Sequence, residues 1–527
     1  MPLSDAEEAQ IKEILKPAVQ EYIEALADFQ SDIKYPPTIE IHHSAFDGSS
    51  VSRELVSHPS RLIHHFQAKN ENDPFQAPIE SLLDKDLDPP AVSPVELLEP
   101  VDNDVIEELN SDNTTRTREC RRLVRTLIRN TLDYAGEYEF HQEAFDAVFE
   151  DHIRPLWDYE NTIDVIIPIS GLSNSFSPIE LPPFQIEHKE ESSSIARLCK
   201  LEIGPFTKSE MSGLRTVDSE FDGLQRNGFS GMPANRTVLS RVRGTVFVKD
   251  HSETATRSAG GGSHWESLAR ELVRLEAKRI LKMLRLYGPN RKQIKLAHVF
   301  TVKPHWITHR EGVEYLTANT FVSDPWVSGI HSGTYEFDDA DAQEFAEQWS
   351  EYGEYLSEDT FSQPLRRFNQ AFGRNTSEDR LIDCFLGFES SVLKGVGSPA
   401  FRLPARSTLL LSGEISESEE VFEFFKIIRK CRNEIVHHDT RIQDINIDDE
   451  NSLDISKLDS ELVEEENLNA SEFEKRGRVY LAMILKKYME LKTAFPDQGS
   501  IQEINNNIVE PRIIRSISES GPIITSD

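Results

Sequence analysis

The densest group of chemically capable side chains lies at the end of one predicted helix, which runs from Glu417 to about His437. Arg432, Asn433 and His437 stand there within six positions, and His438 is the next residue. An arginine holds a phosphate through parallel hydrogen bonds, and a histidine takes up or releases a proton near neutral pH. These residue types can bind an anion and move a proton, so the cluster is the first candidate for a functional site.

A helical wheel gives Arg432 an unusual position for a charged residue. One side of the helix is an apolar stripe made of Val421, Phe425, Ile428 and Ile435. Arg432 falls at the centre of this stripe, where a guanidinium is costly unless it meets an anion, a carboxylate or a partner chain. The structural alternative to a functional site is an internal salt bridge, for which Glu389 or Asp383 on a neighbouring predicted helix would serve.

The spacing of Arg432 and His437 adds a geometric condition. Five steps of about 100° leave the two side chains about 140° apart on an ideal helix, so one helix alone does not build an Arg-His site. Either the helix breaks before the histidines, or the two residues meet their counterparts across the axis of a symmetric dimer.

The C-terminal region resembles the HEPN domains, and among them the Apea-like HEPN group. The resemblance covers roughly Ser362 to Pro496 and rests on three stretches in the family's order. Residues 364–372 resemble the opening helix of the family, and residues 377–393 resemble its second helix. Arg432-Asn433 with His437 is similar to the family's Arg-polar-x3-His signature, which stands at the end of a long helix.

The resemblance implies a helical bundle that dimerises, so that two Arg-His pairs face a shared cleft where many members cut RNA without metal. His437 would then act as general base or acid, and Arg432 would hold the scissile phosphate. Asn433 would orient one of these two side chains. Attack by the ribose 2′-hydroxyl would leave a cyclic phosphate and needs no cofactor. By the same resemblance, such proteins tend to serve defence against phage or other invading elements.

The chain departs from the family pattern just after the signature. The family commonly has a glycine where this chain has His438 and Asp439, followed by a long acidic insert. His438 is therefore a second candidate for the role of the histidine. Because some HEPN domains only bind or dimerise, the alternative function is a catalytically silent module in which Arg432 forms a structural ion pair. A third interpretation is an acidic scaffold protein with a chance motif.

A second group of bases lies in the N-terminal half of the chain. The arginines that fall within a 100° arc of a helical wheel are Arg118, Arg121, Arg122, Arg125 and Arg129. An amphipathic helix of this kind suits a track for the phosphate backbone of RNA. The alternative is that these arginines pair with carboxylates of the same chain, and the surplus of acid favours that alternative.

The overall composition limits the classes of function. The 57 basic and 91 acidic residues give a formal net charge of −34, which argues against a protein that coats DNA. Such acidity is typical of proteins from high-salt cytoplasms. No apolar run approaches the ~18 residues that span a bilayer, so a cytoplasmic protein is expected. The four cysteines form no Cys-x-x-Cys pair and no His-Glu-x-x-His occurs, so no metal site is predicted.

These residues have to be positioned by an α+β chain with a mainly antiparallel sheet followed by an all-α bundle. The expected parts are an N-terminal helix and strand (1–69), an acidic linker (70–113), an α+β sensor or binding region (114–340), a HEPN-like helical domain (341–496, with the insert 439–469) and a polar tail (497–527). The expected strands are 163–169, 198–203, 238–248, 295–302, 315–321 and 334–337. The expected C-terminal helices are 342–356, 364–372, 379–393, 404–411, 417–437 and 471–494.

Two further helices have sequence signals at their ends. Ser4 and Glu7 form a capping box at the start of the first helix, and Pro17 is expected to kink or divide that helix. A strong helix inside the α+β region is expected to begin at Ser263 and to end at Tyr287, before Gly288 and Pro289.

Overall fold

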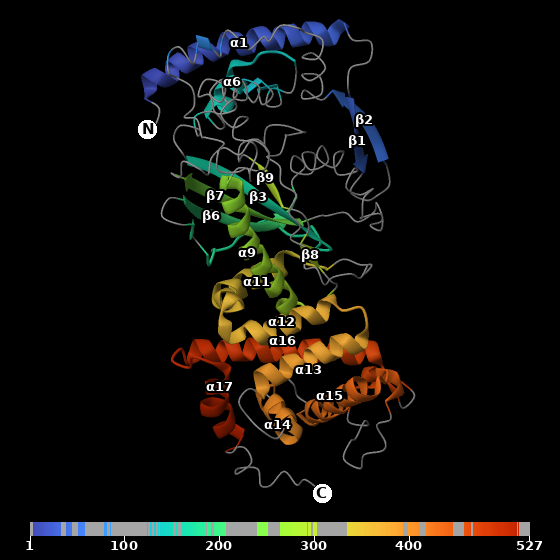
Figure 1. Ribbon diagram of the computed structural model, residues 1–527. Coiled ribbons are helices and arrows are strands. Elements are labelled where there is room, and N and C mark those ends of the chain that lie inside the picture. Colours follow the sequence, from blue (N-terminus) through green and yellow to red (C-terminus); the bar gives the residue numbers. More distant parts are fainter. Residues whose placement is uncertain are drawn as a thin grey trace, which may run out of the picture. The chain divides into compact units, whose positions relative to one another are not determined.

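The structure is a computed structural model (Figure 1). It describes residues 4–32, 38–44, 51–57, 138–150, 160–185, 187–190, 194–206, 240–250, 264–291, 294–296, 299–302, 335–393, 399–411, 418–445, 458–464 and 467–513, with a few single positions between them. The chain divides into two compact units. The N-terminal unit comprises 1–168, 185–275 and 297–322, and the C-terminal unit comprises 169–184, 276–296 and 323–527.

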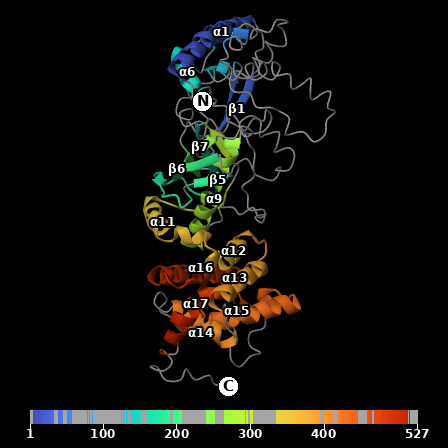
Figure 2. The ribbon, with the colours of Figure 1, turned by 60° about the vertical axis from the view of Figure 1, so that its left-hand side comes forward.

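The N-terminal unit contains an antiparallel sheet, as the sequence predicts. Among its strands are β3 (Glu160–Ser170), β5 (Glu187–Glu190), β6 (Ser194–Pro205), β7 (Ser240–Asp250) and β9 (Phe300–Val302). β5 pairs antiparallel with β6 and β6 with β7 (Figure 2). β9 pairs antiparallel with β3, and β3 lies next to β7. A register shift at Leu198 and Lys200 marks a bulge in β6. A separate hairpin joins β1 (Thr38–Ser44) to β2 (Val51–Ser57).

The strand expected at 334–337 does not form, which corrects that prediction. Tyr335 makes a single bridge to Leu172, and the chain then enters a helix at Asp339. The expected strand at 315–321 lies outside the described residues.

The first helix, α1 (Asp5–Asp32), is continuous through Pro17, so of the two effects expected of this proline, a kink or a division, the division does not occur. Its apolar side is buried at Ile11, Leu15, Val19, Ile23 and Leu26. Burial of this face offsets the hydrogen bond that proline removes. The expected capping box is present, because Ser4 and Glu7 each accept a hydrogen bond from the other's backbone N–H, at 3.3 and 2.9 Å.

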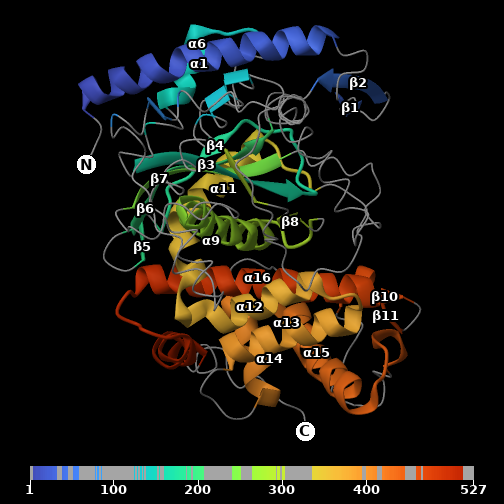
Figure 3. The same cartoon turned by 45° about the horizontal axis from the view of Figure 1, so that its top comes forward.

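The C-terminal unit is a set of packed helices, which Figure 3 shows. They are α11 (Asp339–Tyr352), α12 (Asp359–Gly373), α13 (Ser377–Val392), α14 (Pro399–Leu411), α15 (Ser418–His438) and α16 (Ala470–Ala494). Each coincides with an expected helix, although α12 and α14 begin five residues earlier than predicted. α16 packs against α12, α13 and α14, and α15 packs against α13 and α14. Gly387 of α13 permits a close approach, because a Cβ there would lie 2.5 Å from Leu481 Cδ2 of α16.

The tail after Pro496 is folded up to about residue 513, unlike the polar tail that the sequence predicts. It contains α17 (Ile501–Ile504) and a π-helical turn (Asn505–Val509). The buried Asn505 amide donates to the Ser391 carbonyl at 2.9 Å and accepts from the Tyr488 hydroxyl at 2.5 Å. These bonds satisfy polar groups that would be costly to bury unpaired.

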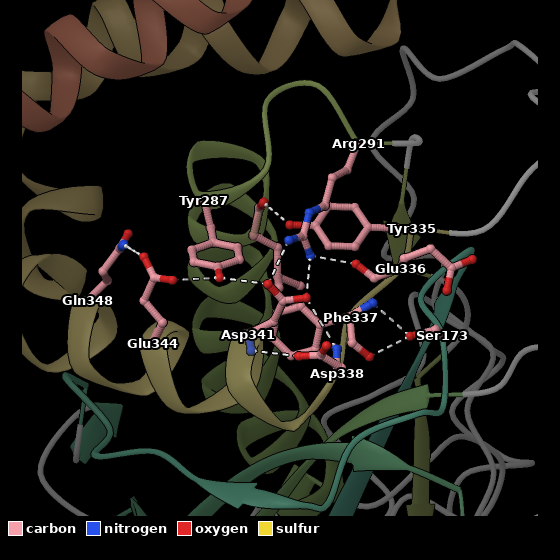
Figure 4. A network of polar contacts seen from close by, with 11 residues as sticks. Ser173, Tyr287, Arg291, Tyr335, Glu336, Phe337, Asp338, Asp341, Glu344 and Gln348 are labelled. Carbon is pink, nitrogen blue, oxygen red and sulfur yellow. Dashed lines mark hydrogen bonds and ion pairs between the residues drawn. The ribbon is translucent and has the colours of Figure 1, made fainter. Parts of the chain in front are cut away.

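A polar network within the C-terminal unit fixes the start of α11 (Figure 4). Arg291 forms two hydrogen bonds to the Asp341 carboxylate, at 2.6 and 2.8 Å. The guanidinium carbon lies 5.2 Å from the ring centroids of Tyr287 and Tyr335, which hold it by cation–π contacts. The Tyr335 hydroxyl donates to the Leu284 carbonyl near the end of α9 (His264–Tyr287), which stops at the expected residue. The network ties α9 to α11 inside this unit.

Asp341→Asn is expected to lower the free energy of unfolding at neutral pH, by an amount that shrinks as the pH falls. The hydrogen bonds from Arg291 lower the pKa of the Asp341 carboxyl to about 2. A lowered carboxyl pKa stabilises the fold above the unfolded pKa of roughly 4, and this stability is lost as pH falls towards the folded pKa. Urea unfolding at pH 6 and pH 3 measures the change, with the exposed Glu347→Gln as control. A difference between wild type and Asp341→Asn that does not depend on pH would contradict the assignment.

Candidate functional site

The residues proposed to carry chemistry lie on the C-terminal half of α15. The other side of this helix is buried in the bundle at Val421, Phe425, Ile428, Cys431 and Ile435. Apolar side chains at helical spacing therefore fix the rotation of α15 and decide which residues remain accessible. Asn433, His437 and His438 are exposed, and Arg432 is half-buried at the border of the buried face.

Arg432 has a hydrogen bond and an aromatic contact, but no carboxylate partner among the described residues. Its Nη1 donates to Asn433 Oδ1 at 3.1 Å. Its guanidinium carbon lies 5.7 Å from the ring centroid of Phe385 on α13. Asn433 and Phe385 thus hold the guanidinium in place and leave its charge uncompensated by any described acid.

The two acids considered as partners of Arg432 do not take that role. Asp383 is buried and accepts hydrogen bonds from Arg367 at 3.0 Å and from Arg374 Nε at 2.6 Å. Within the described part of the chain, no ion pair joins Glu389 to Arg432. The catalytically silent module predicts a structural salt bridge of Arg432. The contacts among the described residues do not include one.

The helix does not break before the histidines, because α15 runs through His438. Arg432 and His437 consequently stay about 140° apart around one helix. The chain turns at Asp439, whose φ of 54° is the left-handed conformation. The Asp439 N–H donates to the Ile435 carbonyl at 3.1 Å, as in the common helix cap that glycine usually supplies. Asp439 therefore adopts the conformation in which glycine commonly ends a helix.

Substitutions at Asp439 test this helix end. Asp439→Val is expected to lower the free energy of unfolding by about 1 kcal/mol, because a β-branched residue resists a positive φ. Asp439→Gly is expected not to lower it, since glycine adopts this conformation freely. Urea unfolding of the three proteins gives the comparison, and a glycine variant less stable than the valine variant would refute the role assigned to Asp439.

The neighbouring thiol does not contribute a nucleophile. Cys431 is fully buried, and burial raises its pKa to about 12, so the thiolate is scarce at neutral pH. Among the residues with described positions, no three His, Cys, Asp or Glu side chains converge as a metal site requires.

The arginine stripe lies outside the described residues at Arg118, Arg121, Arg122, Arg125 and Arg129. On the adjoining face, Val124, Leu127 and Ile128 are helical and buried, which agrees with the expected amphipathic helix. No described helix is both long and apolar enough to cross a bilayer.

Sequence reasoning missed Phe385, and it named Asp439 without predicting that this residue turns the chain at the end of α15. Phe385 lies inside the stretch that resembles the second family helix, but no local pattern connects it with Arg432. Asp439 carries a usable signal, because aspartate is one of the few residues that visit the left-handed conformation.

Comparison with known proteins gives no relative for this chain: no family model, no curated protein and no solved structure matches it.

Proposed function

We propose that the C-terminal unit is a metal-independent endoribonuclease of the HEPN type, whose site forms when two copies of the chain pair. The observation that carries the proposal is Arg432, a half-buried arginine without a described acidic partner in a chain of 91 acidic residues. Such a group stabilises an anion that arrives from outside, and the phosphate of RNA is the anion that suits a guanidinium beside histidines.

Other partly buried arginines of the same bundle support this argument by contrast. Arg367 and Arg374 share Asp383, and Arg476 pairs with Glu420 at 3.1 Å. Partly buried arginines in this unit are thus commonly neutralised within the chain. Arg432 departs from that rule, as does Arg429 one turn before it, and Arg432 does so at the position where the sequence resembles a catalytic signature.

The proposed reaction is a transesterification that each residue type can assist. His437 accepts the proton of a ribose 2′-hydroxyl, and the 2′-oxygen attacks the adjacent phosphorus. The bond from phosphorus to the 5′-oxygen of the next nucleotide breaks, and that oxygen takes a proton from a protonated histidine. Arg432 stabilises the added negative charge on the phosphoryl oxygens, while Asn433 holds the guanidinium through its 3.1 Å hydrogen bond. The products are a 2′,3′-cyclic phosphate and a free 5′-hydroxyl.

The continuous helix is the reason why the proposed site needs two copies of the chain. Arg432 and His437 point away from each other within one copy, so a symmetric partner is required to bring an arginine of one chain to a histidine of the other. His438, which is also exposed, stays as the second candidate for the histidine role. Defence against phage or other invading elements is the biological setting that we propose by resemblance.

The test is an incubation of the full chain with single-stranded RNA in potassium chloride and EDTA. Wild type is expected to cut the RNA and to leave 2′,3′-cyclic phosphate ends, detected by their resistance to 3′-end labelling until the phosphate is removed. RNA that stays intact at all salt concentrations at which the protein is folded would refute the enzyme proposal and favour the silent dimerisation module.

Arg432→Ala is expected to lower the cleavage rate by about 10²–10³-fold, the usual cost of one charge-stabilising donor. Arg432→Lys should recover little of the lost cleavage rate, because an ammonium group does not reproduce the planar arrangement of donors in a guanidinium. Arg366→Ala, which removes an exposed arginine from α12, is the control and is expected to cut like wild type. Equal rates for Arg432→Ala and wild type would remove Arg432 from the site.

A further inference from the structure

We propose that the exposed face of α15 is a track for the sugar-phosphate backbone of single-stranded RNA, with Arg429 and Lys430 as its phosphate-binding side chains. This inference rests on the proposed function. It extends the site from the scissile phosphate to the neighbouring nucleotides and names the substrate as a strand held by its backbone.

The first support is the row that these residues form along the helix. Lys426, Lys430, Asn433 and His437 fall within about 60° of one another on an ideal wheel, so they make a straight line along α15. Arg429 lies between this row and Arg432. In the structure, Asn433 and His437 are exposed, while Lys426, Arg429 and Lys430 are half-exposed. The row therefore leads directly from the two bases to the proposed catalytic residues.

The second support is that two of the three bases on this face have no ion pair with a described acid. Lys426 already has a carboxylate, because its Nζ lies 3.0 Å from Glu423 Oε1. Arg429 and Lys430 have no ion pair with any acid of the described ranges, and the buried Arg429 Nε has no hydrogen-bond partner. Two adjacent cations without an ion pair attract an external polyanion, and Glu434, one turn after Lys430, is the acid that follows them on this side of α15.

The helix dipole does not account for these two bases. Cations near a helix C-terminus are stabilised by the dipole, but this effect falls off within the last turn. Arg429 and Lys430 precede the last residue of α15, His438, by about two turns. The acids Glu419, Glu420 and Glu423 occupy the start of the helix, so the positive part of the row begins at Lys426. The helix dipole thus explains the charged residues at the two ends of α15. It does not explain the two bases in the middle of the helix.

The length of the row fits a short single strand. The eleven steps from Lys426 to His437 span about 16 Å, at about 1.5 Å per residue. A stacked strand advances about 3.4 Å per nucleotide, so the row faces roughly five stacked nucleotides, and fewer when the strand is extended. Contacts of this type go to phosphates and carry no sequence information. Cleavage should therefore depend on strand length and little on sequence.

The experiment measures binding separately from cleavage. A fluorescent 2′-O-methyl oligouridylate of ten nucleotides is bound to the full chain at several salt concentrations, since this strand lacks the attacking hydroxyl. The double variant Arg429→Gln, Lys430→Gln is expected to make the negative slope of log K against log salt shallower by about 1.4, or about 0.7 for each lost phosphate contact. At about 0.1 M salt, affinity should then fall by roughly 10- to 30-fold.

Two controls separate this effect from general loss of charge or fold. Arg366→Gln, Lys487→Gln removes two bases from α12 and α16 and should bind like wild type. The exchange Arg429→Lys, Lys430→Arg keeps the charge and should bind within about threefold of wild type. A double glutamine variant that binds the strand with wild-type affinity and slope overturns the track, as does a wild type that does not bind.

Cleavage of unmodified RNA by wild type is measured in parallel, so that the two proposals fail separately. If wild type cuts RNA but Arg429 and Lys430 do not contribute to the salt dependence of binding, the track is overturned and the enzyme proposal stands. Binding that depends on both residues without any cleavage would retain the track and overturn the enzyme.

Discussion

The His437→Ala variant is expected to cut RNA about 10²–10⁴-fold more slowly than wild type, which is the usual contribution of a positioned general acid or base. His437 is exposed at the end of a helix that is buried on its opposite side, so the substitution removes an imidazole without opening the core. The measurement is the initial rate of cleavage of a labelled single-stranded RNA in EDTA.

The neighbouring histidine provides the matched control for this prediction. His438 is equally exposed and lies one residue further along the same helix, about 100° away. His438→Ala should keep most of the activity if His437 is the acid-base residue. Loss of cleavage in His438→Ala alone would transfer the role to His438, whereas unchanged rates in both variants would remove the histidines from the mechanism.

The Phe424→Ala variant is expected to lower the free energy of unfolding of the C-terminal unit by about 3–5 kcal/mol. Phe424 is fully buried, and its ring centroid lies 4.6 Å from Phe473, 4.9 Å from Tyr480 and 5.5 Å from Phe425. These rings join α15 to α16, so the substitution leaves a cavity at the contact that orients the proposed site. Urea unfolding followed by near-ultraviolet circular dichroism measures the loss.

Phe422→Ala is the matched control for the core prediction. Phe422 is two residues away on the same helix and is only half-buried. Its ring centroid lies 5.9 Å from Lys426 Nζ. Its replacement should cost less than about 1 kcal/mol. If both substitutions destabilise the protein equally, the aromatic cluster is not what holds α15 against α16.

The helices of the C-terminal unit could be predicted because their signals are local. α15 was expected at 417 to about 437 and spans Ser418–His438, and α16 was expected at 471–494 and spans Ala470–Ala494. In both helices the spacing of apolar residues alone defines the buried face. The α+β class follows in the same way from the alternation within strands such as β7.

The segment after Pro496 shows that a short helical pattern does not predict whether the segment folds. Ile501, Ile504 and Ile508 have helical spacing, and Ser500 with Glu503 forms a capping box, so the signal is present in the sequence. A segment of this length is not stable as an isolated helix. It is held by distant partners, such as the hydrogen bond from Asn505 to Ser391, which no local pattern reveals.

The candidate site also has some features that depend on one helix and others that depend on packing between helices. Only the first kind could be predicted from the sequence. The sequence identifies Arg432, His437 and the angle between them, since all three depend on one helix. The choice between Asp383, Glu389 and no partner for Arg432 depends on how separate helices pack, and Arg367 and Arg374 take Asp383. Whether α15 breaks depended on the residue that turns the chain, and Asp439 does so only after His438.

The most direct test of the proposed two-copy site uses two inactive variants in one dimer. Arg432→Ala and His437→Ala chains are co-expressed with different tags, and mixed pairs are isolated by purification on both tags. A mixed pair keeps one Arg432 and one His437 on opposite chains, so it should regain about half of the wild-type cleavage rate, as expected for one of two symmetric sites. Mixed pairs as inactive as either variant alone, or isolation of monomers only, would contradict the account.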